Sequence, residues 1–137
     1  MDVIRVVELI RRKFDEIGSP ADIPLLKGGS FKARLMDEGV EVDNLGTQPF
    51  LNWAAFQEAV CAMIRNGGRA KRGDAMQSRL GDPGLHLDSI EGHVAHVVYG
   101  KRVGETVFRR ITPIGCVLVW AGICRSEPNE LILLDFA

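Results

Sequence analysis

The chain has 137 residues, of which 46% are hydrophobic and 26% are charged, and its formal net charge is -1. This length can close one hydrophobic core, and the composition excludes an intrinsically disordered chain. The net charge excludes binding to nucleic acid or anionic membrane through overall charge alone. We therefore predict a single compact domain over residues 1–137. Nine Lys and Arg against five Asp and Glu give residues 61–110 a local basic character.

The first part of the chain predicts a helix followed by a β-hairpin. In residues 2–17 apolar side chains recur at helical spacing, and Gly18 follows where a C-terminal cap would stand. Residues 31–35 and 40–43 alternate polar and apolar side chains on either side of the turn sequence Asp37-Glu38-Gly39. This alternation around turn residues is typical of a hairpin.

The middle of the chain predicts two further helices joined by a long loop. Helical spacing returns after Pro49 and stops at Asn66-Gly67-Gly68. Residues 69–87 are rich in glycine and show little periodicity, so we expect a long loop with at most short structure. Residues 89–99 predict a third helix, with Asp88 at the start of a capping box.

The last part predicts a buried helix and a terminal strand. Thr112-Pro113 has the form of a cap and a first helical residue, and residues 114–123 are apolar on every side. Such a helix must be buried all round, either at the centre of the domain or against a second copy of the chain. Residues 130–136 fit a closing strand. The predicted fold is α+β, with about four helices packed with a β-hairpin and a C-terminal strand, and a homodimer is the expected assembly.

The cysteines and the hydropathy pattern indicate where the protein resides. Cys61, Cys116 and Cys124 fit neither a redox pair nor a zinc spacing, so they are interpreted as small buried hydrophobes in a reducing compartment. The N-terminus does not resemble a signal peptide. The most apolar run, residues 111–124, has 14 residues and is too short to span a membrane. We predict a cytoplasmic protein without a membrane partner.

One hypothesis for the function is DNA recognition. Residues 89–112 resemble a helix-turn-helix in outline, with a helix, a turn that opens at Gly100, and a second segment with basic side chains. The turn is longer than the usual three or four residues, and the same basic residues also fit a structural role. The residues assigned to DNA in this alternative are Lys101, Arg102, Thr106, Arg109 and Arg110, with help from Arg69, Lys71 and Arg72.

A metal-dependent hydrolase is a third hypothesis. His93 and His96 lie three residues apart on the predicted helix and would project within one turn of each other. The spacing implies no third ligand, and Glu91 is already explained as the third residue of the capping box. The pair also fits two hydrogen-bonded histidines that flank the buried stripe. We predict neither a metal nor a cofactor.

The leading hypothesis is a self-associating module that binds a small molecule or a partner protein. No residue pattern fixes a catalytic mechanism, so we assign no catalytic residue. A binding pocket needs aromatic walls and a few convergent polar groups. The residues expected to line it are Trp53, His93, His96, Tyr99 and Arg109.

Overall fold

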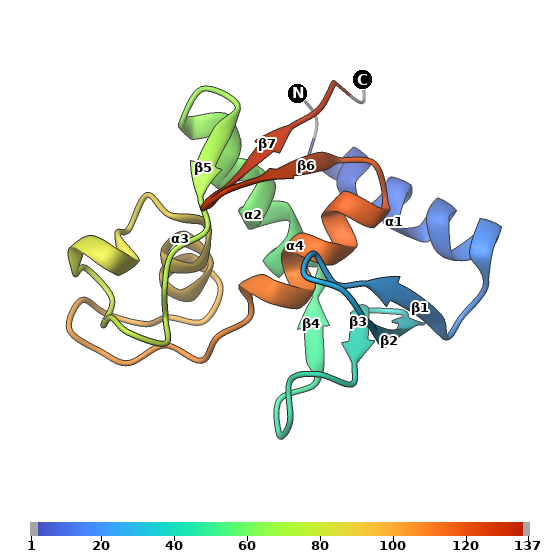
Figure 1. The fold of residues 1–137 in the computed structure, drawn as a ribbon, viewed down its shortest axis with the longest axis horizontal. Helices are drawn as coiled ribbons and strands as arrows, with labels where there is room; N and C mark the ends of the chain where they lie inside the picture. The colour runs from blue at the N-terminus through green and yellow to red at the C-terminus, as the bar shows by residue number, and fades with distance from the viewer. Residues whose placement is uncertain (1–2, 136–137) are drawn as a thin grey trace.

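The computed structural model describes residues 3–135, and over this part the protein is an α+β fold with four α-helices and two antiparallel sheets (Figure 1). The predicted fold class is confirmed. In chain order the elements are α1 (Ile4–Ile17), β1 (Ala21–Pro24), β2 (Ser30–Met36), β3 (Gly39–Val42), β4 (Phe50–Asn52), α2 (Trp53–Arg65), β5 (Arg69–Lys71), the 3-10 turn η1 (Pro83–Leu85), α3 (Ile90–Val97), α4 (Ile111–Trp120), β6 (Cys124–Glu127) and β7 (Glu130–Leu133).

The first sheet is a four-stranded meander in the order β1-β2-β3-β4. The predicted hairpin is confirmed as β2 and β3, which turn between Met36 and Gly39. A side chain at Gly39 would place its Cβ only 2.0 Å from the carbonyl oxygen of Leu51 on β4. Glycine is therefore required where β3 and β4 approach each other.

The second sheet has three strands in the order β5-β7-β6. The predicted terminal strand corresponds to β7, which forms a tight hairpin with β6, and residue 136 of that prediction lies outside the described residues. On its other edge β7 pairs with β5, a strand that comes more than fifty residues earlier in the chain. The sheet thus ties the middle of the chain to its C-terminal part.

Helix α4 lies at the centre of the fold, between the two sheets (Figure 1). It contacts α1, α2, β1 and β6, and Ile114, Val117 and Leu118 are fully buried among these elements. Seven of its ten residues are thus buried by the chain itself, which favours the first of the two arrangements that the sequence left open, while Thr112, Val119 and Trp120 are half-buried. The helix begins at Ile111, so the predicted cap at Thr112 is wrong, and Pro113 stands inside the first turn, where no backbone donor is needed.

The predicted long loop contains β5 and η1 and is held in place by a small second core. Leu80 and Leu85 of this loop are fully buried against Ala95 of α3 and Val107 of the segment between α3 and α4. Backbone hydrogen bonds join the two segments, from Leu80 N–H to the Glu105 carbonyl and from Gly104 N–H to the Leu80 carbonyl. The loop is therefore a packed part of the fold.

Helix α3 ends at Val97, two residues earlier than predicted, and its N-cap residue also differs from the predicted one. Its cap is Ser89, whose hydroxyl oxygen accepts the Gly92 N–H at 3.0 Å, so Asp88 does not start a capping box.

Among the described residues, no helix is long and apolar enough to cross a membrane.

Two helical glycines provide a test of how tightly α3 is packed. A Cβ on Gly92 would lie 2.1 Å from the carbonyl oxygen of His86, whereas a Cβ on Gly115 of α4 would meet only the Leu131 side chain at 3.4 Å. We expect Gly92→Ala to lower the free energy of unfolding by about 2 kcal/mol or more, because the backbone must move. Gly115→Ala should stay within about 1 kcal/mol of wild type, since the gain in helix propensity offsets mild crowding. Denaturant unfolding measures both; equal effects would contradict the packing described.

Candidate functional site

Two of the predicted site residues have structural partners of their own. The Trp53 indole N–H donates to the Asp37 carbonyl at 2.9 Å, and Arg11 stacks 5.3 Å from the ring centroid. His93 is buried between α3 and α2, with its Nε2 atom 2.9 Å from a carboxylate oxygen of Glu58. Trp53 therefore stabilises the β2–β3 turn, and His93 links the two helices.

The other three predicted residues lie on or near the segment that joins α3 to α4. His96 is exposed, with its Nδ1 atom 2.8 Å from the Lys101 carbonyl oxygen. Tyr99 packs under the guanidinium group of Arg110, while the exposed Arg109 lines a separate groove. The five side chains thus do not line one common pocket: Arg109 lines one groove, Tyr99 lines another pocket, and the other three line neither.

The two histidines do not converge on a shared site. His93 is directed to Glu58 on α2, and His96 is directed to the backbone of Lys101. Within residues 3–135, no group of three His, Cys, Asp or Glu side chains is arranged to hold a metal ion. The geometry therefore gives the metal-dependent hydrolase no support.

The prediction of a helix-turn-helix over residues 89–112 is wrong for its second helix. Residues 98–110 form no helix, and the next helix begins only at Ile111. The reason is packing, since Val107 is buried in the small core and Phe108 packs against the main core. Of the residues assigned to DNA, Arg102, Thr106 and Arg109 are exposed, whereas Lys101 is half-buried and Arg110 is buried.

A buried carboxyl group, that of Glu91, caps the first turn of α4. It accepts the backbone N–H of Arg110 at 2.7 Å and that of Ile111 at 3.2 Å. Burial raises its pKa to about 7, although the two N–H donors and the nearby Arg110 and Arg109 act in the opposite direction. Sequence reasoning missed this role because the contact joins residues about twenty positions apart, and no local pattern signals it.

Next to this cap, the Arg110 side chain is buried among aromatic and polar groups. Its guanidinium carbon lies 3.6 Å from the centroid of the Tyr99 ring and 4.9 Å from that of Phe108. Its Nη2 atom donates to the side-chain oxygen of Gln48 at 2.7 Å. A cation between two ring faces is stabilised by their quadrupoles, so the orientation of the guanidinium is fixed.

Two buried polar atoms at this place lack a partner. Within the described part of the chain, the Nε of Arg110 and the hydroxyl of Tyr99 have no hydrogen-bond partner. No carboxylate there lies within ion-pair distance of Arg110, which is only 6% exposed. Desolvation raises the pKa of Tyr99; Arg110 lowers it by a smaller amount, and Glu91 raises it further. The Tyr99 hydroxyl is therefore a neutral donor. An unsatisfied buried group costs about 1–3 kcal/mol.

Tyr99 and Arg110 both line a small pocket with a volume of about 490 Å³. Its lining residues are Gln48, Tyr99, Lys101, Thr106, Val107, Phe108 and Arg110. Sequence reasoning had named Tyr99, Lys101, Thr106 and Arg110, but divided them between two hypotheses. It missed Gln48, Val107 and Phe108, which carried no motif.

Comparison with protein-family models, with curated proteins and with solved structures found no match to this chain.

The Glu91 carboxyl group makes stability depend on pH. Its pKa is higher in the folded protein than the ordinary value of 4.5, so the folded state holds the proton more tightly. The free energy of unfolding should therefore fall as pH rises from about 4.5 to about 7, by up to about 3 kcal/mol. Glu91→Gln keeps an oxygen acceptor without titrating, and we expect it to flatten this part of the profile.

Glu38→Gln, which removes an exposed carboxyl group on the β2–β3 turn, is the matched control and should keep the wild-type slope. Urea unfolding at a series of pH values provides the measurement. If Glu91→Gln and Glu38→Gln give the same slope between pH 5 and pH 7, Glu91 does not titrate as described.

Proposed function

We propose that the protein is a binding module for a small molecule that carries a carboxylate or phosphate group. The observation that supports this proposal is the buried guanidinium group of Arg110, whose Nε has no hydrogen-bond partner in the described part of the chain. The neighbouring Tyr99 hydroxyl is also buried there without a hydrogen-bond partner. A ligand that supplies oxygen acceptors would satisfy both groups and bring the counter-charge that Arg110 lacks.

The chemistry of the pocket lining favours this ligand class. Lys101 and Thr106 add an ammonium and a hydroxyl group to the donors of Arg110 and Tyr99. The Gln48 side-chain oxygen, an acceptor in the lining, is engaged by Arg110. Val107 and the Phe108 ring supply apolar wall, and the volume lies within the range of small-molecule sites. The matching ligand is a small anion with an apolar body.

The proposal concerns binding and assigns no chemical step. A cytoplasmic location and self-association remain sequence predictions that accompany it. The apolar α4 no longer supports a dimer, because the chain's own residues cover it. DNA recognition also remains an alternative, which exposed Arg102, Thr106 and Arg109 would serve through phosphate contacts.

The test is a calorimetric titration with benzoate and with inorganic phosphate. We expect binding by the wild type and about tenfold weaker binding by Tyr99→Phe, because one hydrogen bond to a charged ligand is lost. The same substitution should leave the free energy of unfolding unchanged or higher, since the hydroxyl makes no internal hydrogen bond. Thr112→Val, which removes a hydroxyl outside this pocket, is the control and should bind as wild type does.

Two results would contradict the proposal. One is the absence of anion binding in the wild type. The other is a Tyr99→Phe variant that unfolds more easily but binds equally well, which would make the hydroxyl structural. Tight, strongly salt-dependent binding of a DNA duplex that Arg109→Ala weakens would favour the DNA alternative instead.

A further inference from the structure

A second, larger groove lies elsewhere on the molecule and shares no lining residue with the Tyr99–Arg110 pocket. Its volume is about 1480 Å³. Its walls are the β1–β2 turn, β5 with the segment that follows it, the first half of α4 and the β6–β7 turn. This volume exceeds the range of about 300–1000 Å³ that is typical of small-molecule sites, so a longer ligand fits it better.

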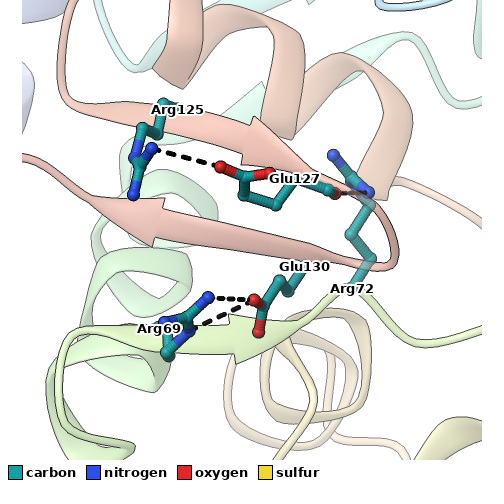
Figure 2. Close-up of polar contacts among 5 residues, drawn as sticks. All are labelled: Arg69, Arg72, Arg125, Glu127 and Glu130. Atoms are coloured by element: carbon teal, nitrogen blue, oxygen red, sulfur yellow. Dashed lines mark hydrogen bonds and ion pairs between the residues drawn. The ribbon is translucent and has the colours of Figure 1, made fainter.

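Arg72 is the fixed cation of this groove. Its Nη1 atom donates to the Glu127 carbonyl at 3.0 Å (Figure 2). Its Nη2 atom donates to the Ser126 hydroxyl, and both partners belong to the last two residues of β6. These partners are neutral, so they orient the guanidinium without neutralising it. Burial raises the pKa of the Cys116 thiol, while a Leu26 N–H and then Arg72 act to lower it. Cys116, a buried residue of α4, also lines the groove.

Of the four acidic residues that line the groove, two are paired with arginines. Glu130 pairs with Arg69 across β5 and β7, and Glu127 pairs with Arg125 at 3.1 Å on β6 (Figure 2). Asp74 accepts the N–H groups of Met76 and Gln77, and Asp88 faces His86.

Four of the cations that line the groove have no carboxylate partner in the described part of the chain. Among the described residues, no carboxylate lies within ion-pair distance of Lys27, Lys71, Arg72 or Arg109. All four line the groove. These four cations outnumber the two lining carboxyl groups, those of Asp74 and Asp88, that have no arginine partner.

The free edge of β5 adds backbone groups to this surface. The Arg72 N–H donates to the Asn129 carbonyl, and the Leu133 N–H donates to the Gly68 carbonyl. These two hydrogen bonds fix which backbone groups of β5 point toward β7. The N–H and carbonyl groups of Arg69 and Lys71 therefore point to the opposite, outer edge. An extended peptide can pair with such an edge as an added strand.

The remaining wall residues indicate the kind of peptide. Leu26 is 47% exposed and Met76 is 66% exposed, so the groove also offers apolar contacts. None of the lining residues is Phe, Tyr or Trp, so the groove lacks the stacking surface on which single-stranded nucleic acid binds. We infer that this groove binds an extended segment of a partner protein in which acidic and apolar side chains alternate.

The test uses a short fluorescein-labelled peptide of alternating glutamate and leucine, measured by fluorescence anisotropy. We expect saturable binding, weakened at least about tenfold by the double substitution Lys27→Glu/Arg109→Glu, because both exposed cations are reversed. Arg12→Glu reverses an exposed cation on α1, outside the groove, and should bind as wild type does.

Further control experiments distinguish the proposed peptide binding from nonspecific binding, from binding at the Tyr99–Arg110 pocket and from nucleic-acid binding. A peptide of alternating lysine and leucine should not bind. Tyr99→Phe should leave the affinity for the glutamate–leucine peptide unchanged, so that the proposal for the groove and the proposal for the Tyr99–Arg110 pocket are tested independently. A cooperative thermal unfolding transition shows that the double variant is folded. The inference is overturned if the peptide does not bind, if the double variant binds as Arg12→Glu does, or if single-stranded DNA competes with the peptide at equal affinity.

Discussion

The first turn of α4 is held by a buried carboxyl group, and much of the structure depends on this contact. Glu91 accepts two N–H groups where α4 begins, which fixes one end of the helix that both sheets pack around. Its own backbone N–H donates to the Arg72 carbonyl at 2.9 Å. One residue thus connects the groove cation Arg72, the central helix and the pocket cation Arg110.

The energetic logic of this arrangement is a balance between burial and hydrogen bonding. A buried carboxylate loses its hydration, and two N–H donors at a helix N-terminus offset part of that loss. The pKa of about 7 shows that desolvation remains the larger effect. The neighbouring Arg110 has the opposite charge but is committed to Tyr99, Phe108 and Gln48 rather than to an ion pair with Glu91. Its Nε and the Tyr99 hydroxyl are left without a hydrogen-bond partner in the described part of the chain.

The parts of the fold that follow from local periodicity were predictable from sequence. Helix α1 and the β2–β3 hairpin have one buried face each, and their spacing shows it directly. Contacts between distant segments left no such trace. Glu91 has the spacing of a capping-box residue, yet its carboxyl group reaches a helix start about twenty residues later. The same contact starts α4 at Ile111 rather than after Thr112.

The candidate site was predictable only in part, for a related reason. The sequence indicated that Tyr99 and the basic residues after it carry chemistry, but not which of the two adjacent arginines turns inward. Packing of Val107 and Phe108 keeps the segment from forming a helix, and Arg110 is buried while Arg109 stays exposed. Gln48 comes from the loop between β3 and β4, which no motif connects to this segment.

The central claim is that Arg110, held beside the Glu91 cap, is a binding group rather than only a packing element. The most direct measurement is the nuclear magnetic resonance signal of each arginine Nε–Hε group during a titration with benzoate. The account predicts a saturable shift of the Arg110 signal, with the Arg72 signal unmoved. An Arg110 signal that stays in place while benzoate binds elsewhere, or while no binding occurs, would contradict it.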